Sequence, residues 1–477
     1  MTSKLSKDAV HRVALGVMMG GFEGTRVPDW LLTETEAGLA SVCLFSQNTP
    51  DLGITRAITD RLGDNTNGPV VCVDEEGGDV TRLQSVQGSG LPGNSALGHL
   101  DDIGLTLSCG AALGNMCAQA GIDVALGPVL DVASEPCSSA ISTRSFGPDP
   151  HLVLRHGGAW LDGLYTSGTR SCAKHFPGHG ATAVDSHSAM PVLTSSLQTL
   201  RDQDMAPFLA LSHRLDAIMT AHIVVREMGD QPASLSSWAT AALREGGFAG
   251  VIMTDALGMR AITANRSLGE GSVLALRAGA DLLCLDAPHQ RDPRTALREV
   301  EKAIVEAVVD GFLSPDRLQA SAERNRRLKR EQPRDFGDGA EAELDRVGLI
   351  VARRSLQARG DCTVTGAVVV VDLRRRANLA VSHSLAFIAT LTQNLSTSRT
   401  ASHPGDIRPG EMPVVVTRQG RCDPTEEAEM RQVLAGHPDA VVLHAGLPST
   451  APEHTRVLLC HGVGRANACA AAERLTP

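Results

Sequence analysis

One short part of the chain concentrates side chains that could act on a substrate. Lys174–Gly180 reads Lys-His-Phe-Pro-Gly-His-Gly, and Asp185–His187 reads Asp-Ser-His. Histidine and aspartate can donate and accept protons, and lysine supplies a positive charge. The glycines and proline predict a loop, and the apolar run Ser171–Ala173 before them predicts the end of a buried strand. Titratable groups on a loop that follows a strand are typical of active sites in α/β enzymes.

The spacing of these groups suggests acid–base chemistry. Asp185 and His187 are two residues apart, so the carboxylate can approach the imidazole, fix its tautomer and raise its basicity. His187 is therefore a candidate proton donor, and Asp185 would orient it. Asp255, at the end of a predicted strand, is a candidate nucleophile or general base, while Lys174 and His175 could bind substrate hydroxyls. Two catalytic groups on opposite sides of a bond are what glycoside cleavage uses.

Buried strands that alternate with helices must position these groups. Continuous apolar runs separated by helix-length segments are typical of a parallel sheet, and eight such units predict a (β/α)8 TIM barrel. A Rossmann-type sheet is the alternative, but the glycines of Gly16–Gly24 have the wrong spacing for its phosphate-binding turn. The predicted strands are Val13–Met18, Ala40–Phe45, Pro69–Val73, Val124–Leu130, Arg170–Lys174, Ala217–Ala221, Gly250–Thr254 and Ala280–Leu285.

Polar residues follow these strands where functional residues of a barrel lie, at the carboxyl ends. A convergence of charges on one face favours a catalytic constellation, although each residue alone could be a salt bridge or a helix cap. The residues are Asp74 and, eight positions later, Arg82, then Asp131, Arg144, Lys174, His175, His222, Asp255 and Asp286.

A second, smaller α/β domain is expected after the barrel. The barrel should span residues 1–330, a linker 331–344, and the small domain 345–477, because Glu331–Ala340 carries the proline, aspartate and glycine of a linker. No catalytic cluster falls in the small domain. Its predicted elements are strands at Ala367–Leu373, Val414–Arg418, Val441–His444 and Arg456–Cys460, and helices at Ser382–Thr392 and Thr425–Ala435.

Composition excludes several classes of protein. A net charge of -10 argues against nucleic acid as a partner. No apolar run approaches the roughly 18 residues of a membrane span, and the N-terminus lacks the apolar core of a signal peptide. The 11 cysteines are scattered without a Cys-x-x-Cys pair, which predicts reduced, buried thiols in a cytoplasmic protein instead of a disulfide framework or a zinc site.

Two other chemistries fit the loop less well. His175 and His179 could bind a metal with Asp185 or His187, but Pro177-Gly178 opposes a helical pair of ligands. Lys174 could form a Schiff base, but a histidine follows it and no phosphate-binding glycine loop is evident after strands seven and eight. We therefore expect neither a metal nor a cofactor.

The Lys174–Gly180 and Asp185–His187 motifs resemble the signature of the glycoside hydrolase family 3 β-N-acetylhexosaminidases, in the NagZ-like branch. The similarity spans about residues 15–290, and the second domain resembles the extra domain of some bacterial members. It includes Gly21–Thr25, Asp74–Gly78, Gly127–Val132, Arg144–Gly147, Met219–His222 and Thr254–Met259. The chain departs from the family's usual pattern at Asp79, where arginine normally follows Glu-Gly-Gly, and at Gly20, normally proline.

The resemblance implies a retaining double displacement on terminal β-linked N-acetylglucosamine. Asp255 matches the nucleophile, His187 the acid/base, and Asp185 the other member of its dyad. The substrates implied are small muropeptides or chitooligosaccharides, in cytoplasmic cell-wall recycling. The residues that match the sugar-binding positions are Asp74, Arg82, Arg144, Lys174 and His175.

Three alternatives stay open. A neutral imidazole does not repel an anion, so phosphate could replace water and make the enzyme a phosphorylase. A non-catalytic sugar-binding protein would be expected to lose Asp255, Asp185 or His187, yet all three are present. A β-glucosidase of the wider family would use a glutamate as its acid/base and lack the Asp-Ser-His loop. The leaving group, the oligomeric state and the role of the second domain are not determined by the sequence.

Overall fold

The computed structural model describes residues 7–63, 68–138, 140–182, 186, 189–285, 291–330, 339–375, 386–395 and 398–477. Eight parallel strands form a ring in the order β10-β1-β2-β3-β4-β5-β7-β9. A bridge from Met253 to Leu282 joins the last strand of this order to the first. The strands are β1 (Met18–Gly20), β2 (Ser41–Leu44), β3 (Val70–Val73), β4 (Val124–Ala125), β5 (Arg170–Phe176), β7 (Ala217–Thr220), β9 (Val251–Thr254) and β10 (Leu283–Cys284).

This ring confirms the predicted barrel, although strand bounds differ: β4 ends at Ala125 instead of Leu130, β5 continues to Phe176, and the first strand is displaced. The first strand was expected at Val13–Met18, but Val13–Leu15 ends a helix and the strand begins at Met18. The apolar face of that helix continues into the strand without a polar break, so the pattern does not mark the boundary. The helices that precede, surround or follow the ring strands are α1 (Lys7–Leu15), α2 (Asp29–Ala37), α3 (Leu52–Gly63), α4 (Asn94–Leu100), α5 (Ile103–Gln119), α6 (Pro150–Tyr165), α7 (Leu197–Asp202), α8 (Ala206–Leu211), α9 (Ser237–Glu245), α10 (Arg260–Thr263), α11 (Leu268–Ala278), α12 (Pro293–Val309) and α13 (Pro315–Arg326).

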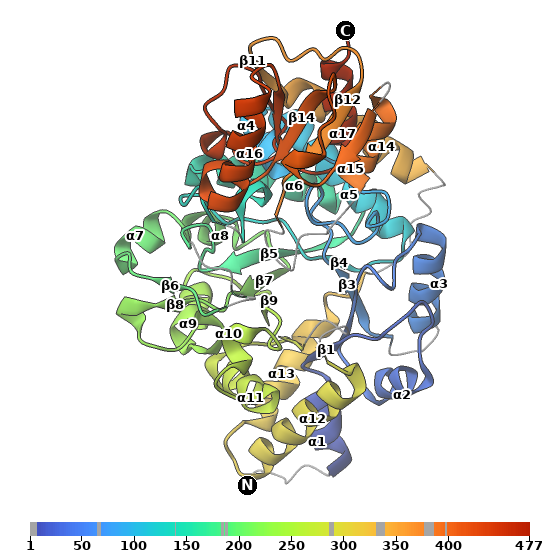
Figure 1. The fold of residues 1–477 in the computed structure, drawn as a ribbon. Coiled ribbons are helices and arrows are strands. Elements are labelled where there is room, and N and C mark those ends of the chain that lie inside the picture. Colours follow the sequence, from blue (N-terminus) through green and yellow to red (C-terminus); the bar gives the residue numbers. More distant parts are fainter. Residues whose placement is uncertain are drawn as a thin grey trace.

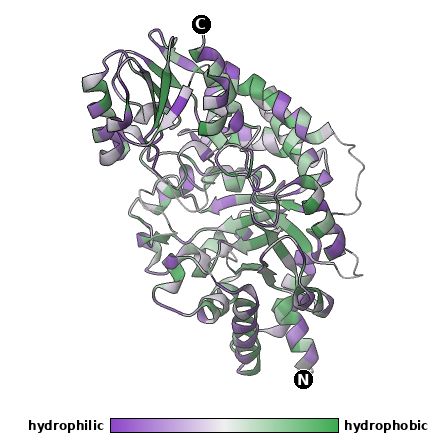
Figure 2. Cartoon of the chain, turned by 45° about the vertical axis from the view of Figure 1, so that its right-hand side comes forward, coloured by the Kyte–Doolittle hydropathy of each residue, from purple (hydrophilic) through white to green (hydrophobic). Residues whose placement is uncertain are grey.

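Two apolar layers hold the barrel together. Alternate strand residues such as Cys43, Cys72 and Met253 fill its interior, while their neighbours such as Val42 and Val71 pack outward against the helices. Burial on both faces explains why the strands read as continuous apolar runs. Figure 2 shows this hydropathy pattern, with apolar strands inside helices of mixed character.

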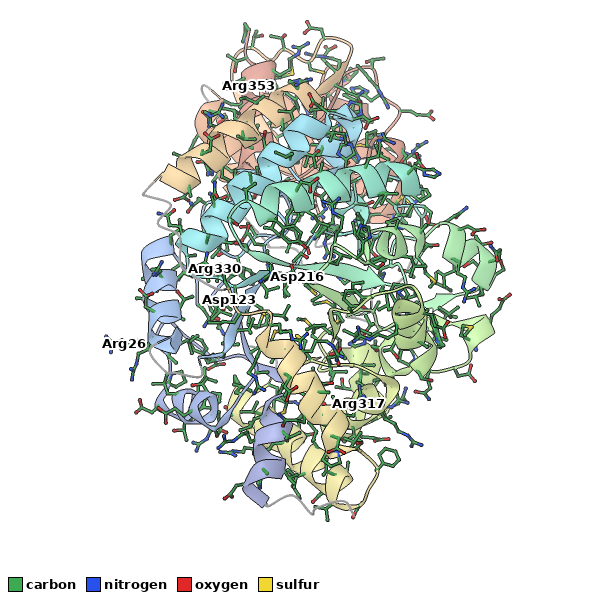
Figure 3. The ribbon with its side chains drawn as sticks, turned by 180° about the vertical axis from the view of Figure 1, so that it is seen from behind. Arg26, Asp123, Asp216, Arg317, Arg330 and Arg353 are labelled. Carbon is green, nitrogen blue, oxygen red and sulfur yellow. A yellow bond between two sulfur atoms is a disulfide. The ribbon has the colours of Figure 1, made fainter. Side chains whose placement is uncertain are left out.

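The amino ends of the strands carry a repeated structural device. Asp123, Asp216 and Asp281 each lie at the start of a strand, and each carboxylate accepts a hydrogen bond from a backbone amide of the neighbouring strand. The donors are Val71 N at 2.8 Å, Ser171 N at 3.0 Å and Ile252 N at 3.0 Å. Figure 3, seen from behind, labels Asp123 and Asp216 beside these strands. These aspartates fasten neighbouring strands at the amino rim, the face of a barrel that serves stability.

The C-terminal part is a separate domain built on a six-stranded sheet, which lies above the barrel in Figure 1. The strand order is β11-β16-β15-β14-β12-β13, and only β11 is antiparallel to its neighbour. Apolar clusters cover both faces of this sheet. The elements are β11 (Gln357–Arg359), β12 (Val368–Asp372), α15 (Ala386–Asn394), β13 (Ser398–Ala401), β14 (Met412–Thr417), α16 (Pro424–Gly436), β15 (Val441–His444), β16 (Val457–Leu459) and α17 (Arg465–Leu475).

Helix α14 (Ala340–Ser355) joins the two domains. It packs against α4 and α5 of the barrel and against α17 of the second domain. Residues 340–344 of the expected linker are therefore helical, and 331–338 lie outside the described residues. The acidic residues Glu341 and Glu343 in its first turn suit the start of a helix, which explains why a loop was the wrong interpretation there.

The expectation that all cysteines are reduced is wrong for one pair. Cys137 and Cys422 form a disulfide between residues 285 positions apart, one in each domain. Spacing along the sequence cannot reveal such a pair, because the fold alone brings its members together. The other nine are free thiols, and all but Cys469 are buried as predicted. Among the described residues, no helix is long and apolar enough to cross a membrane.

Helices α5 and α6 approach each other closely at glycines. Alanine substitutions at the buried Gly163 and at the exposed Gly104 should therefore change the stability of the protein in opposite directions. A Cβ atom added to Gly163 would lie 2.1 Å from the carbonyl oxygen of Leu107, so Gly163→Ala must push the helices apart. We expect it to cost about 1–3 kcal/mol of stability. At Gly104, exposed in the first turn of α5, the nearest atom is 3.5 Å away. Gly104→Ala should gain up to about 1 kcal/mol of helix propensity. Thermal unfolding midpoints of the two variants should therefore move in opposite directions.

Candidate active site

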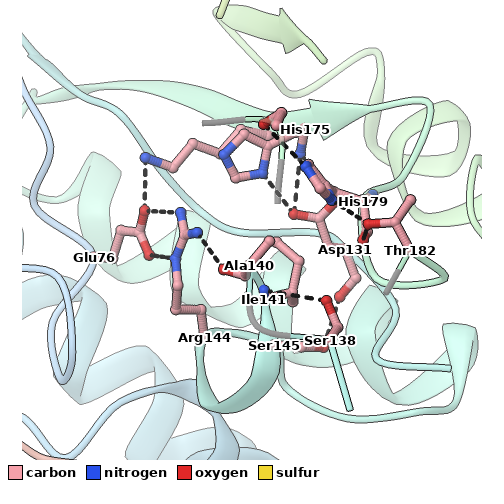
Figure 4. Close-up of polar contacts among 12 residues, drawn as sticks. Glu76, Asp131, Ser138, Ala140, Ile141, Arg144, Ser145, His175, His179 and Thr182 are labelled. Carbon is pink, nitrogen blue, oxygen red and sulfur yellow. Dashed lines mark hydrogen bonds and ion pairs between the residues drawn. The ribbon is translucent and has the colours of Figure 1, made fainter. Parts of the chain in front are cut away.

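A chain of buried ion pairs lies at the carboxyl rim of the barrel. Arg144 makes a two-pronged contact with Glu76, with Nε–Oε2 at 2.8 Å and Nη2–Oε1 at 2.7 Å. Lys174 Nζ lies 2.7 Å from Glu76 Oε1 and 2.6 Å from Asp74 Oδ1. Arg82 Nη2 lies 3.7 Å from the other oxygen of Asp74. The loops after β3 and β4 thus share one electrostatic network with strand β5, part of which Figure 4 shows.

Asp74 is the most accessible member of this network. Its side chain is 25% exposed, against 2% for Lys174 and 3% for Glu76. Its confined position would raise the pKa of Asp74, but Lys174 and Arg82 outweigh that effect and hold the pKa below its usual range. Asp74 therefore presents a charged acceptor to the barrel mouth, and the buried cations behind it fix its orientation.

The pKa values of the neighbouring glutamates Glu75 and Glu76 are shifted in opposite directions. Burial would raise the pKa of Glu76, but Arg144 and Lys174 lower it to about 2. Burial raises the pKa of Glu75 to about 7, and it outweighs the Thr81 hydroxyl, the 2.9 Å hydrogen bonds from Leu83 N and Arg82 N, and the charge of Arg82, all of which favour the anion. Glu76 is a permanent anion of the site, whereas Glu75 shapes the loop that carries Arg82.

Asp131 organises the histidine-rich loop after β5. It is fully buried and accepts hydrogen bonds from His175 Nδ1 at 2.7 Å and from the backbone amide of His179 at 2.6 Å. Burial opposes its charge, but the interactions with His175 and then His179 lower the pKa of Asp131 below its usual range. The contact fixes the His175 ring with Nδ1 toward Asp131, as Figure 4 shows.

His179 anchors the segment that contains the predicted acid/base pair. Its Nδ1 lies 2.6 Å from Thr182 Oγ1, and its Nε2 lies 3.2 Å from the hydroxyl of Ser186. Burial and then the nearby His175 lower the pKa of His179 to about 4, so this ring is neutral. Asp185 and His187 themselves lie outside the described residues, but the buried Ser186 stands between them in the chain.

Asp255 follows β9 directly and is partly exposed. The backbone amide of Ala256 donates to its Oδ1 at 2.8 Å, and its own amide bonds to Thr220 O at 2.9 Å. His222, after β7, contacts the carbonyl oxygen of Ala256 at 2.9 Å through Nε2. Asp255 also contributes to the charge environment of His179. The turn after β9 is thus held by contacts with Thr220 and His222, at and after the end of the neighbouring strand β7. The Asp255 carboxylate lies at the same rim as the histidine-rich loop after β5.

The structure therefore brings together Asp74, Arg82, Arg144, Lys174 and His175 in two adjoining clusters. Sequence reasoning did not assign roles to Glu76 and Asp131, which hold these clusters together. Both follow predicted strands, so their positions were visible, but nothing in the spacing distinguishes Glu76 from Glu75.

The two glutamates offer a matched pair of variants. Glu76→Gln leaves Arg144 and Lys174 without a shared counter-charge and should lower kcat/KM by on the order of 100-fold through misplacement of these groups. Glu75→Gln resembles the protonated acid that burial favours and should stay within a few-fold of the wild type. Steady-state kinetics on a chromogenic β-N-acetylglucosaminide, the kind of substrate that the family resemblance implies, would compare them. Equal losses in both variants would contradict this division of roles.

Comparisons with known proteins agree with the geometry. The model of the glycosyl hydrolase family 3 N-terminal domain matches residues 22–328. A β-hexosaminidase from Alkalilimnicola ehrlichii is 31% identical over 348 residues, which cover 68% of this chain and 99% of that protein. A solved family 3 β-N-acetylglucosaminidase from Paenibacillus superposes with a TM-score of 0.82 at 25% identity, covering 99% of this chain and 97% of that one. NagZ from Neisseria gonorrhoeae, solved with N-trifluoroacetyl-D-glucosamine, covers 71% of this chain and 98% of its own, with a TM-score of 0.60 and 26% identity. The chain belongs to glycosyl hydrolase family 3, among its β-hexosaminidases.

Proposed function

We propose that the chain is a retaining exo-β-N-acetylglucosaminidase that forms a glycosyl-enzyme on Asp255. The observation that carries the proposal is the partly exposed Asp255 carboxylate at the rim that also holds the Asp74–Lys174 pair. A carboxylate that attacks the anomeric carbon needs the sugar held beside it, and charged groups that bind hydroxyls supply that hold.

In this proposal the buried network binds the terminal N-acetylglucosamine. Asp74 accepts hydrogen bonds from sugar hydroxyls, because it is the network's most accessible carboxylate. Lys174 and Arg82 hold it in place and limit the reorganisation needed on binding. Arg144 and His175 complete the sugar-binding set, each fixed by a buried carboxylate.

His187 acts as acid and then as base, with Asp185 orienting its ring. It protonates the leaving oxygen while Asp255 forms the covalent bond, and it then deprotonates the water that releases the sugar. The hydrogen bond between His179 and Ser186 supports this assignment, since it anchors the residue between the two members of the dyad.

The proposed substrates are terminal β-linked N-acetylglucosamine units of small muropeptides or chitooligosaccharides, and the proposed role is peptidoglycan recycling. The N-acylglucosamine bound to the gonococcal NagZ supports this sugar.

The buried free thiols are typical of a cytoplasmic enzyme, and we propose that location. Because disulfides are rare in a reducing compartment, this location makes the Cys137–Cys422 disulfide an exception among the cysteines of the chain. Free-thiol counting on protein isolated under alkylating conditions would test the compartment.

A phosphorylase is the second candidate, because a histidine acid/base does not repel phosphate as a carboxylate would. Cleavage of a chromogenic β-N-acetylglucosaminide should be measured with and without inorganic phosphate, with identification of the sugar product. Free N-acetylglucosamine at equal rates in both supports the hydrolase. Faster turnover with phosphate, giving the β-1-phosphate that two successive inversions require, would replace it with the phosphorylase.

Replacement of the proposed nucleophile gives a direct test. Asp255→Ala should lower kcat by at least about 1,000-fold, because no group remains to form the covalent intermediate. Azide, a small anion, should partly restore cleavage of an activated substrate by taking the nucleophile's place and forming an α-glycosyl azide. Asp230→Ala, at an aspartate whose side chain is 85% exposed, is the matched control and should leave kcat unchanged. Full turnover in Asp255→Ala would sink the proposed mechanism.

A further inference from the structure

The loop after β4 is fastened to the C-terminal domain at two independent points. This β4 loop comprises residues 131–138 and 140–147. Its first attachment is covalent, the disulfide from Cys137 to Cys422 in the segment between β14 and α16. Its second runs from Thr143 through Asp79 to Arg418, the residue that follows β14. Both attachments thus end in one short stretch of the second domain.

Asp79 is the centre of the second attachment. Its Oδ2 accepts a hydrogen bond from Thr143 Oγ1 at 2.6 Å and from Arg418 Nη2 at 2.5 Å, and its Oδ1 accepts from Val463 N at 2.9 Å. The side chains of Asp79 and Arg418 are only 2% and 5% exposed. A buried ion pair of this kind is costly to break by removing one partner. Asp79 thus places a buried carboxylate where an arginine of the second domain docks.

The β4 loop passes this restraint on to the site. Thr143 precedes Arg144, whose guanidinium binds Glu76 and whose carbonyl oxygen accepts from Asn94 Nδ2 at 2.7 Å. At its other end, Glu135 N donates to Gly180 O at 3.0 Å, in the loop after β5. The β4 loop therefore touches the second domain on one side and both site clusters on the other.

We propose that the C-terminal domain is a positioning element of the substrate site, acting through Arg418, Asp79 and the Cys137–Cys422 disulfide on Arg144. The proposal rests on the sugar-binding role of Arg144 proposed above. Arg418 and Asp79 are positioning residues: they are buried against each other and fix the backbone that carries the proposed sugar-binding group Arg144. The site is complete only when the second domain is docked.

The test uses the full chain with Arg418→Met, the double variant Cys137→Ser/Cys422→Ser, and their combination. The control is Arg354→Met, which removes an exposed ion pair between α14 and Asp102, next to α5, without a link to the β4 loop. We expect KM for a chromogenic β-N-acetylglucosaminide to rise about tenfold or more in Arg418→Met, with kcat much less affected. Loss of folded enzyme alone would lower kcat and leave KM unchanged. The combined variant should exceed either change, and Arg354→Met should match the wild type.

Amide hydrogen exchange of the β4 loop supplies a readout that needs no turnover. Faster exchange there in Arg418→Met and in the cysteine double variant, but not in Arg354→Met, is expected. Unchanged exchange and unchanged KM in both would overturn the proposal. If the wild type fails to cleave the substrate, the proposed function fails, and the exchange of the β4 loop still decides whether the second domain positions it.

Discussion

The charge of the buried Glu76 carboxylate is the constraint on which the substrate side of the barrel depends. It faces Arg144 from the β4 loop and Lys174 from β5, and Lys174 in turn holds Asp74 after β3. Each of these charges would be costly to bury alone, and together they compensate one another. The cost of leaving any of them unpaired keeps the β3 loop, the β4 loop and strand β5 in register.

Aspartates lie beside the strands at both rims of the barrel, but their roles at the two rims differ. At the amino rim, Asp123, Asp216 and Asp281 accept bonds from backbone amides and also pair with Lys329, Arg170 and Arg324 respectively, and so act as fasteners. At the carboxyl rim, Asp74 and Asp255 keep part of their surface open. Residue type alone therefore does not mark a catalytic position. The direction of the neighbouring strand marks such a position, because the carboxyl ends of all eight strands meet at one rim.

The barrel was predictable because burial on two faces leaves an unmistakable run of valine, isoleucine and cysteine in strands such as Val70–Val73. The same rule placed the site residues Asp74, Lys174 and Asp255 at strand ends. It could not separate Glu75 from Glu76, since their difference arises from cations more than 60 positions away in the chain. Asp79 departs from the family pattern, and only the packing of the second domain brings it a cationic partner, Arg418. The disulfide was missed for the same reason.

The disulfide joins residues 285 positions apart, so it cannot form until most of the chain has been made. Domains fold from the amino terminus onward as a chain is synthesised. Strands β5, β7, β9 and β10 therefore leave the ribosome and can close the barrel while Cys137 still lacks its partner. The order of synthesis thus separates two events, closure of the barrel and fastening of the β4 loop. In a chain truncated before Cys422 the barrel could close, but its β4 loop would lack the covalent link to the second domain.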